Sequence, residues 1–359
     1  MKKIVTILGA RPQFVKAAVL SRIISKYKQI EEVIVHTGQH YDSNMSAIFF
    51  NEMEIPTPKY NLAINGMSHG AMTGQMLLKI EEVLIDEKPD LVVVYGDTNS
   101  TLAGALAAKK MNIKVVHIEA GLRSFNMKMP EEINRIVTDR ISDLLLCPTV
   151  TAIENLDNEG FGNLPNKVVK CGDIMKDAVS YYSQFSANKS SIINDLNFRN
   201  NNFVLATIHR QENTDVLSNL KSIFEGLEKI NNSMPVVVPL HPRTKGILAK
   251  NKLKYNLKFI DPVGYFDMLE LLKNCNLVVT DSGGLQKEAF FNKKHCIIAR
   301  EETEWVELVS NGFAKIVGSN TTNMFNSFVE FQESKVDFSL NLYGENSGEQ
   351  MYNEIYKII

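Results

Sequence analysis

The chain has 359 residues, of which 44% are hydrophobic and 22% are charged, and its formal net charge is −2. This length exceeds one ordinary core, so we expect two soluble globular domains. The nearly balanced charge argues against a general nucleic-acid binder or a protein of anionic membranes, and no apolar stretch reaches the roughly 20 residues of a membrane span.

Short apolar runs alternate with amphipathic helical stretches along the whole chain. The first run is cut short by Gly9 and Arg11, so we interpret it as a buried strand rather than a signal peptide. The alternation is typical of parallel sheets with helices on both faces, which predicts an α/β fold with two doubly wound halves. The first set of predicted strands is Ile4–Leu8, Val33–His36, Leu91–Tyr95, Val115–Ile118 and Leu144–Cys147. The second set is Val168–Lys170, Phe203–Thr207, Val236–Pro239, Lys258–Ile260, Leu277–Thr280, Cys296–Ala299 and Ala314–Val317.

The two halves should meet near residues 170–177, which predicts domains of 1–170 and 171–346. A final helix at about 347–359 is expected to pack back on the first domain. We interpret the polar segment 188–202 as a helix and surface loop within the second half. The cysteines show no CxxC spacing and lie in or beside apolar runs, which favours buried thiols over disulfides or a zinc site. They are Cys147, Cys171, Cys275 and Cys296.

Ligands of parallel α/β sheets bind beyond the carboxyl ends of the strands, so the residues there are the candidates for a site. After the first strand, Arg11 and Lys16 flank a turn into a helix, which suits an anion at a helix N-terminus. The same residues could be ordinary surface charge. The nicotinamide fingerprint GxGxxG is missing from this position. The loop 37–42 after the second strand is either a substrate contact or a solvated turn.

Gly96 and Asp97 directly follow the fully apolar strand Leu91–Tyr95, so they lie at the carboxyl end of that strand, where ligands bind. Asp97 could cap the next helix, but Thr98 and Ser100 can fill that role, so we favour a catalytic or site-organising carboxylate. The next strand ends at Glu119.

A helix then begins at Pro130, with Glu131 and Glu132 in its first turn, where acids favour the helix dipole. Glu131 and Arg135 lie four residues apart and so share a helix face. The acids are either catalytic or simply capping residues.

Basic and small residues follow the strands of the second half. His209 and Arg210 are adjacent at one strand end, and His241 begins the next loop, which favours a phosphate or proton-transfer site over a structural histidine. The turn Ser282-Gly283-Gly284 leads into a helix, where backbone can approach an anion closely. Glu288 on that helix could bind ribose hydroxyls or could be exposed. No spacing of metal ligands is visible.

Seven separated motifs carry a family resemblance. They are Gly9–Lys16, Gly96–Thr98, His117–Arg123, Pro130–Arg135, His209–Glu212, His241–Pro242 and Asp281–Glu288. In this order they resemble the non-hydrolysing UDP-N-acetylglucosamine 2-epimerase family, from residue 9 to about 312. The resemblance implies the glycosyltransferase-B architecture, in which two Rossmann-like domains enclose the active site in a central cleft.

The resemblance also implies roles for individual residues. It implies that the catalytic acids and bases are Asp97, Glu119, Glu131 and His209. Substrate or diphosphate contacts fall to Arg11, Lys16, Arg135, Arg210, His241, Ser282, Gly283 and Gly284. Glu288 would hold the ribose, and Tyr265 would stack or pack on uracil.

The chain departs from the family pattern at three places. Ala10 and Gln13 replace Thr and Glu in the opening motif, Gln211 replaces an arginine, and Trp305 replaces the arginine of a Thr-Glu-Arg-Pro-Glu segment. These differences resemble a subgroup that acts on UDP-2,3-diacetamido-2,3-dideoxy-glucuronate. Residues 300–302 are therefore candidates for sugar specificity, and Trp305 is either one of them or ordinary packing.

The chemistry of the family agrees with these residues. The C2 proton of a 2-acetamido sugar is not adjacent to a carbonyl, and the nicotinamide fingerprint is absent, so elimination and re-addition of UDP is the remaining route. Such a route needs two acid/base groups and cationic or N–H donors for the departing diphosphate. It needs no cofactor and no metal.

Three other functions remain open at this stage. They are a glycosyltransferase of the same architecture, a hydrolysing 2-epimerase and a sugar-nucleotide-binding protein without activity. The expected partner is a UDP-sugar, with neither nucleic acid nor membrane. A cytoplasmic homodimer that supplies surface-polysaccharide precursors is expected from the resemblance.

Overall fold

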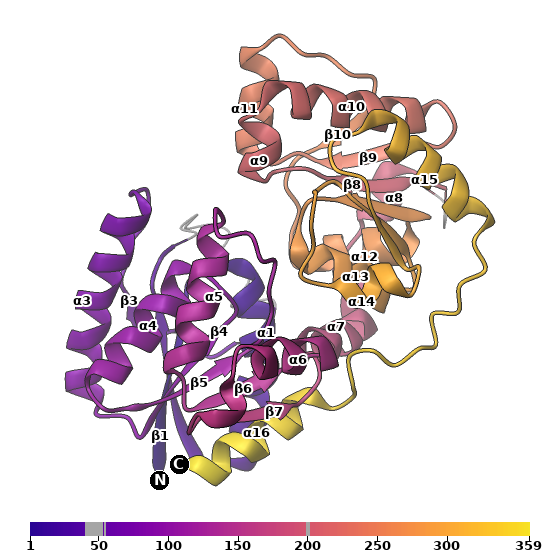
Figure 1. The fold of residues 1–359 in the computed structure, drawn as a ribbon. Helices are drawn as coiled ribbons and strands as arrows, with labels where there is room; N and C mark the ends of the chain where they lie inside the picture. The colour runs from indigo at the N-terminus through magenta and orange to yellow at the C-terminus, as the bar shows by residue number, and fades with distance from the viewer. Residues whose placement is uncertain (40–52, 54, 199–201) are drawn as a thin grey trace. The chain divides into compact units, whose positions relative to one another are not determined.

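The computed structural model describes residues 1–39, 53, 55–198 and 202–359. The chain forms two compact units (Figure 1): the first combines Met1–Ala178 with Asn341–Ile359, and the second is Val179–Leu340. Each unit is built on one parallel sheet, which confirms the predicted α/β fold with two doubly wound domains. The central cleft implied by the resemblance stays a prediction.

The first unit contains a seven-stranded sheet in the order β3-β2-β1-β4-β5-β6-β7. Its strands are β1 (Lys2–Leu8), β2 (Ile30–His36), β3 (Tyr60–Asn61), β4 (Leu91–Tyr95), β5 (Lys114–Ile118), β6 (Leu144–Cys147) and β7 (Lys167–Lys170). Its helices are α1 (Arg11–Tyr27), α3 (His69–Glu87), α4 (Asn99–Lys110), α5 (Pro130–Ile141), α6 (Val150–Asn158), the short η1 (Phe161–Asn163) and α16 (Ser347–Ile358). The helix α7 (Ile174–Lys189) runs from this unit into the next.

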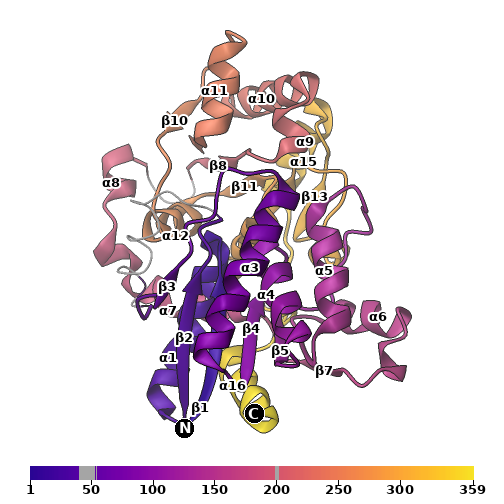
Figure 2. The same cartoon turned by 90° about the vertical axis from the view of Figure 1, so that its left-hand side faces the viewer.

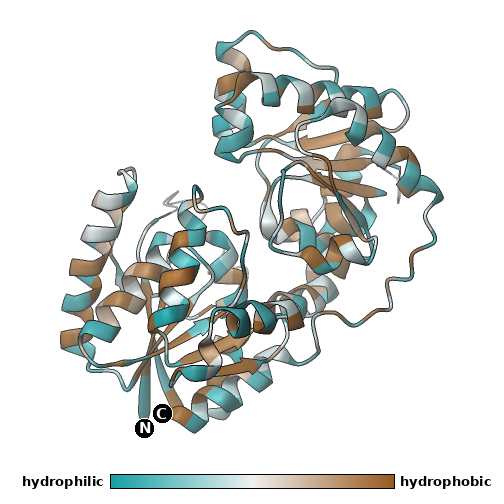
Figure 3. Cartoon of the chain, in the orientation of Figure 1, coloured by the Kyte–Doolittle hydropathy of each residue, from teal (hydrophilic) through white to brown (hydrophobic). Residues whose placement is uncertain are grey.

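The strand order reverses direction at β1, so right-handed crossovers place the helices on both faces of the sheet. Helices α3, α4 and α5 lie side by side on one face, as Figures 1 and 2 show together. Helices α1 and α16 pack against each other on the opposite face. Between them the central strands are apolar and buried (Figure 3); Val5, Val94 and Val115, for example, have no exposed surface.

The second unit contains a six-stranded sheet in the order β10-β9-β8-β11-β12-β13. Its strands are β8 (Val204–Thr207), β9 (Val236–Pro239), β10 (Lys258–Ile260), β11 (Leu277–Thr280), β12 (His295–Ile298) and β13 (Ala314–Ile316). Its helices are α8 (Ile192–Leu196), α9 (Gln211–Thr214), α10 (Leu217–Asn231), α11 (Pro242–Lys250), α12 (Tyr265–Asn274), α13 (Gly283–Phe291), α14 (Val306–Ser310) and α15 (Thr321–Glu333).

One strand assignment was wrong. We placed Val168–Lys170 with the second set, but β7 pairs with β6 at the edge of the first sheet, with Leu145 opposite Val168. The error has a physical reason, because apolar content marks a strand without saying which sheet it joins. Every strand pair in both sheets is parallel, and the two β-strand orders reverse between β1 and β4 and between β8 and β11. These two switch points are where ligands of such sheets bind.

The four cysteines are buried and free, as predicted. Burial raises the pKa of the Cys171 and Cys275 thiols to about 12, which keeps them protonated. Among the described residues, no helix has both the length and the apolarity that crossing a membrane requires.

The final helix α16 is held on α1 by polar and aromatic contacts. Glu349 accepts hydrogen bonds from Lys26 Nζ at 3.0 Å and from Tyr27 Oη at 2.8 Å, and Tyr352 stacks on the ring of Tyr27 with 4.8 Å between centroids. Gly348 lies so close to α1 that a Cβ atom there would come within 2.7 Å of Ile23 Cδ1.

Candidate active site

Glu119 ends β5 in a strained conformation. Its φ is +73°, a left-handed value that is costly for a residue with a side chain. The N–H groups of Glu119 and Ala120 both donate to the carbonyl of Leu146 at 3.1 Å, which holds the turn in this shape. The side chain forms an ion pair with Lys16 of α1, and both side chains are at least nine-tenths buried. Strain of this kind is often kept at functional positions.

Gly96 lies directly beside this ion pair. Its φ is +62°, and a Cβ atom built on it would lie 3.2 Å from Glu119 Oε2 and 3.7 Å from Lys16 Nζ. The turn after β4 therefore needs glycine for its backbone conformation, and the absence of a side chain lets the ion pair lie close against it.

Asp97 is fixed by two neighbouring residues of α5. Arg135 donates from Nε and Nη2 to Asp97 Oδ2 at 3.0 and 2.9 Å, and Asn134 donates from Nδ2 to the Asp97 carbonyl at 2.9 Å. The N-cap of α4 is Thr98, whose hydroxyl accepts from the backbone N–H of Thr101. Asp97 is thus not the capping residue, and its carboxylate, which is one-third exposed, is oriented by an arginine.

The two acids in the first turn of α5 differ sharply. Glu132 has no exposed surface, receives Arg135 Nη1 at 2.5 Å, and accepts hydrogen bonds from Ser124 and from the backbone N–H of Phe125. It is a structural residue that shapes the loop before the helix. Glu131 is half-buried and has no ion pair or hydrogen bond in the part of the chain that the structure describes. Of the two, Glu131 is the acid left available for chemistry.

Gln13 organises the turn after β1, although it was not predicted as a site residue. Its Oε1 accepts from the backbone N–H groups of Gly9 and Ala10 at 2.7 and 3.0 Å, and its Nε2 donates to the carbonyl of Tyr95 at 2.7 Å. The turn that carries the half-buried Arg11 is therefore tied to the end of β4.

Part of the loop 37–42 lies outside the described residues, namely His40, Tyr41 and Asp42. Within the described part, Gln39 Oε1 accepts from the backbone N–H and the hydroxyl of Ser100 at 3.1 and 2.8 Å. This contact ties the start of the loop to α4.

In the second unit, a buried carboxylate shapes the loop that carries His209 and Arg210. Asp281 has no exposed surface and accepts from the backbone N–H groups of His209 and Arg210 at 3.0 and 2.9 Å, and from Asn213 Nδ2 at 3.0 Å. His209 Nδ1 also lies 3.3 Å from Asp281 Oδ1, and 40% of the histidine side chain is exposed. Asp281 thus presents the histidine toward solvent at the β8/β11 switch point.

His241 lies beside His209, with 5.8 Å between the ring centroids. It is the N-cap of α11, and its Nδ1 accepts from the backbone N–H of Arg243. The capping contact fixes the orientation of this exposed ring at the start of α11.

The turn at residues 282–284 begins α13, with Ser282 as its N-cap. A Cβ atom at Gly284 would meet nothing within 4 Å, so the backbone there is open to a ligand. A Cβ atom at Gly283 would face Glu304 and Trp305, at 3.6 and 3.8 Å. The segment around Trp305 therefore lies beside the first turn of α13.

Trp305 is only 3% exposed, and Lys287 Nζ lies 3.9 Å from its ring centroid, a cation–π contact. Arg300 and Glu304 form a buried bidentate ion pair, with both N···O distances 3.0 Å. Trp305 is thus firmly packed next to the predicted diphosphate turn.

Tyr265, predicted to contact uracil, is a buried residue at the start of α12 that interacts electrostatically with Glu288. Tyr265 is 5% exposed and packs edge-on against Tyr182, with 5.7 Å between ring centroids. Burial, and then the charge of Glu288, raise the pKa of the Tyr265 phenol well above its usual value. Glu288 itself is half-buried. The uracil and ribose roles stay predictions.

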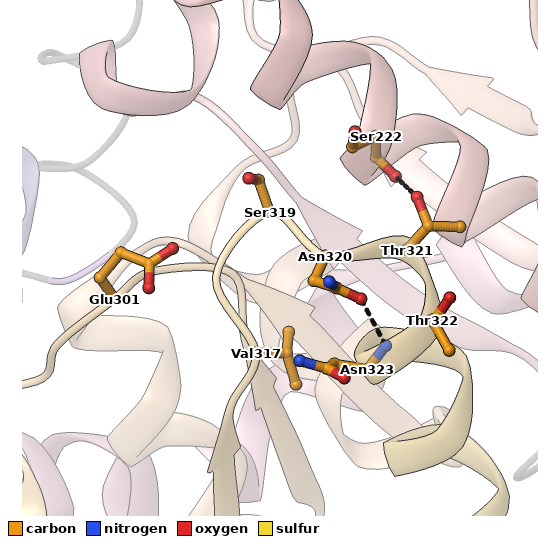
Figure 4. Close-up of a pocket in the computed structure, with 8 residues that line it drawn as sticks. All are labelled: Ser222, Glu301, Val317, Ser319, Asn320, Thr321, Thr322 and Asn323. Atoms are coloured by element: carbon orange, nitrogen blue, oxygen red, sulfur yellow. Dashed lines mark hydrogen bonds between the residues drawn. The ribbon is translucent and has the colours of Figure 1, made fainter.

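A separate cavity of about 530 Å³ opens at the start of α15 (Figure 4). It includes Glu301, one of the candidates for sugar specificity, but none of the predicted catalytic or diphosphate-binding residues. It is lined by Ser222, Glu301, Val317, Ser319, Asn320, Thr321, Thr322 and Asn323. Two of these polar side chains are already engaged, because Asn320 caps the N–H of Asn323 at 2.8 Å and Thr321 donates to the Ser222 carbonyl at 2.7 Å.

Comparisons with known proteins point to one family. The family model for UDP-N-acetylglucosamine 2-epimerase matches residues 22–355. The chain is 54% identical, over 88% of each chain, to the UDP-2,3-diacetamido-2,3-dideoxy-D-glucuronate 2-epimerase of Pseudomonas aeruginosa. It is 48% identical, over 99% of each chain, to a UDP-N-acetylglucosamine 2-epimerase homolog of Methanococcus maripaludis.

A solved structure agrees with these relatives. The Methanocaldococcus jannaschii UDP-GlcNAc 2-epimerase, crystallised with UDP-GlcNAc and UDP, superposes with a TM-score of 0.92 at 41% identity. The match covers 99% of this chain and 100% of that one. The chain therefore belongs to the UDP-N-acetylglucosamine 2-epimerase family.

Proposed function

We propose that this chain interconverts the C2 epimers of a UDP-2-acetamido sugar by elimination and re-addition of UDP. We further propose that its preferred substrate is UDP-2,3-diacetamido-2,3-dideoxy-glucuronate. The observation that carries the reaction is the pairing of two carboxylates with cations at adjacent strand ends: Glu119 with Lys16, and Asp97 with Arg135. The half-buried Glu131 supplies a third acid in the same unit.

The reaction begins with removal of the C2 proton as the C1–O bond to UDP breaks, which leaves an unsaturated sugar. UDP then adds back to C1 while a proton returns to the opposite face of C2. The two faces need two different acid/base groups. Asp97, Glu119 and Glu131 are the candidates, with His209 as a further proton-transfer group. The cations paired with Asp97 and Glu119 hold these two carboxylates in fixed orientations, which favours proton transfer over a short distance.

The departing diphosphate gains negative charge in the transition state, so the residues that bind it must stabilise most of the charge that develops. In the second unit, Arg210 and His241 supply cationic or N–H donors for it. The open backbone of the 282–284 turn supplies the positive end of the α13 dipole. Glu288 and Tyr265 would bind the ribose and uracil.

The preference for the diacetamido-uronate rests on two features. The 54% identical relative from Pseudomonas aeruginosa is named for that substrate. Trp305, which replaces a family arginine, packs beside the first turn of α13, next to the proposed diphosphate site. A changed residue there is well placed to alter which sugar is accepted.

Proton NMR in D₂O tests both parts of the proposal. Purified protein is incubated separately with UDP-2,3-diacetamido-2,3-dideoxy-glucuronate and with UDP-GlcNAc, and the C2 signal and the product configuration are followed. We expect C2 deuteration and the manno epimer, with faster turnover of the diacetamido-uronate. Free sugar and UDP as irreversible products would indicate a hydrolysing enzyme, and turnover only with an added acceptor would indicate a glycosyltransferase.

The variants D97N and E119Q test the acid/base assignment. Loss of one such group typically costs about 10²–10⁴-fold in kcat. E82Q is the matched control, because Glu82 is an exposed carboxylate of the same unit on the outer surface of α3, where it pairs with Lys79. Activity of D97N and E119Q equal to that of E82Q would remove these residues from the mechanism.

Three wider expectations accompany this proposal. The product would be a precursor of a surface polysaccharide, the enzyme would work in the cytoplasm, and it would be a homodimer. Light scattering coupled to size exclusion tests the dimer directly, and a monomeric mass at working concentration would contradict it.

A further inference from the structure

His117 is a fully buried histidine whose two ring nitrogens each face an acceptor. It lies on β5, two residues before Glu119. Nε2 lies 2.7 Å from the carbonyl of Gly96, and Nδ1 lies 2.7 Å from Asp139 Oδ1. A carbonyl cannot donate, so Nε2 must carry a proton.

Asp139 forms an ion pair with Arg123 and is therefore a carboxylate, so Nδ1, 2.7 Å from its Oδ1, carries a proton as well. The other oxygen of Asp139 accepts from the N–H of Gly121 at 3.1 Å and from Arg123 Nη1 at 2.7 Å. Burial alone would raise the pKa of Asp139, but the charges of His117 and Arg123 outweigh it and lower the pKa below its usual value. The ring of His117 is therefore a doubly protonated donor clamped between two acceptors.

The charges around this ring balance. Arg123 pairs with Asp139 and also forms a bidentate pair with Glu159, at 2.6 and 2.8 Å. Two cations thus face two carboxylates. Cys147, which lies near Asp139, stays a neutral thiol because burial raises its pKa well above the usual value. A balanced and fully hydrogen-bonded cluster of this kind can be rigid without leaving a bare buried charge.

The cluster reaches both turns that carry the proposed catalytic carboxylates. Through His117, Asp139 holds the carbonyl of Gly96, whose peptide leads into Asp97. Through its own Oδ2, it holds the N–H of Gly121, which closes the turn after Glu119. Both glycines have left-handed φ values of +62° and +79°, so each turn needs outside support to keep its shape.

We propose that Asp139 and His117 form a positioning pair that fixes the separation of Asp97 and Glu119 by holding the turns after β4 and β5 together. Neither side chain contacts the substrate. This inference rests on the proposed epimerase function, in which the two carboxylates must keep a fixed relation to C2. Their positions matter for the proton transfers, whereas the binding of UDP is assigned largely to other residues.

The single variants H117Q and D139N should therefore lower kcat by at least about tenfold, while KM changes by less than about threefold. The reason is that misplaced reacting groups raise the energy of the transition state, whereas the binding of the substrate in its ground state stays largely intact. In H117Q, the new amide can still donate to the Gly96 carbonyl, but its oxygen faces the Asp139 carboxylate. In D139N, an N–H₂ group faces Nδ1 of His117, so the ring either loses this hydrogen bond or gives up its Nδ1 proton. Each single change therefore removes the charged hydrogen bond that joins the two residues.

The double variant H117Q/D139N should restore the arrangement without charge. The Asn amide can donate to the Gln oxygen and still accept from Gly121 and Arg123, and the Gln amide can donate to Gly96. We expect kcat to recover to within about threefold of the wild type, which is the signature of coupled partners. T138V is the matched control on the same helix, because the buried Thr138 hydroxyl has no hydrogen-bond partner in the described structure.

Each outcome decides one point. A double variant that regains the wild-type unfolding temperature but not kcat would show a stabilising role alone and overturn the proposal, as would single variants that raise KM while kcat stays unchanged. Correlation of protons with the ring nitrogens of His117 by NMR, in the wild type at neutral pH, should show two N–H groups. One N–H group would overturn the assigned hydrogen bonds. This spectrum does not depend on activity. If the wild type does not epimerise the substrate, the proposed function is wrong, and the number of N–H groups in the spectrum still decides whether His117 and Asp139 are paired as described.

Discussion

Arg135 is the residue whose replacement we expect to reveal most about the first unit. Its guanidinium, only 2% exposed, pairs with the fully buried Glu132 and with Asp97. Arg135→Met keeps the length of the side chain but leaves the Glu132 carboxylate without its cation. Breaking a buried pair on one side costs about 3–5 kcal/mol, because the remaining charge is left without compensation.

Three hydrogen bonds would remain on that carboxylate. They come from the N–H and hydroxyl of Ser124, at 3.0 and 3.1 Å, and from the N–H of Phe125 at 2.9 Å. These donors offset part of the loss, so we expect the variant to lose about 2–4 kcal/mol of unfolding free energy. For a unit of this size, that lowers the unfolding temperature by roughly 5–12 °C. The activity should fall too, since Asp97 loses the group that orients it.

Guanidinium denaturation followed by circular dichroism, together with calorimetry, measures the effect. The double variant E132Q/R135M removes the stranded charge, and we expect it to regain at least about half of the lost stability. It should stay catalytically impaired, because Asp97 remains unpaired. If R135M unfolds at the wild-type denaturant concentration, or if the double variant is no more stable than R135M, the buried pair does not have the energetic role assigned to it.

Three further changes test other contacts. Gly9→Ala should lower kcat/KM at least about tenfold, as measured by kinetics on the purified variant. The new Cβ atom would lie 2.0 Å from Ser100 Oγ and must displace the turn that carries the proposed anion site. Gly348→Ala should cost about 1–2 kcal/mol of unfolding free energy, since its Cβ atom would press α16 off α1, and denaturation measures it. Hydrogen bonds from Lys59 and then from other partners lower the pKa of Glu87 from its usual 4.5 to about 2 in the folded protein. The contribution of Glu87 to the unfolding free energy is therefore complete above pH ~4.5 and is lost as the pH falls toward 2. Glu87→Gln should therefore destabilise the protein by about 1–2 kcal/mol at pH 7, a value reduced by solvent screening, and by progressively less below pH ~4.5.

These three predictions can fail independently. Wild-type kinetics for the Gly9 variant would mean that the β1 turn does not position the substrate. A Gly348 variant with unchanged stability would show that α1 yields to the added methyl group without cost. A stability difference for Glu87→Gln that stays constant from pH 7 to pH 2 would assign its effect to packing.

The sequence was sufficient to predict the alternating elements and most strand limits, because the strands of a doubly wound sheet are buried on both faces and read as continuous apolar runs. Leu91–Tyr95 and Leu277–Thr280 were predicted with the limits that the structure has. The strand β3 was missed, since it has only two residues and one of them is polar. The strand β7 was assigned to the wrong sheet, because the pairing of a strand depends on the path of the chain and not on its local composition.

The candidate site could be located from the sequence only in part. Residues that directly follow a strand were visible, because the carboxyl ends of parallel strands gather at one edge of the sheet. The residues that hold them were not. Asp139 lies in the last turn of α5. Gln13, Asn134, Asp139 and Asp281 act through hydrogen bonds to distant backbone groups that no local pattern reveals. Glu132 was seen as an acid of the first turn, but only the structure shows that it is buried and structural.

The return of the chain to its first unit has a consequence for its synthesis. The second unit is an insertion, since residues 341–359 complete a body that began at residue 1, and near the junction the N–H of Asp173 donates to the Tyr343 carbonyl at 2.9 Å. On the ribosome, the inserted unit is therefore fully translated before the first one has its last helix. Until then the surface of α1 that α16 will cover stays open to water and to chaperones, so a nascent chain stalled late in translation would hold one finished unit and one unfinished one.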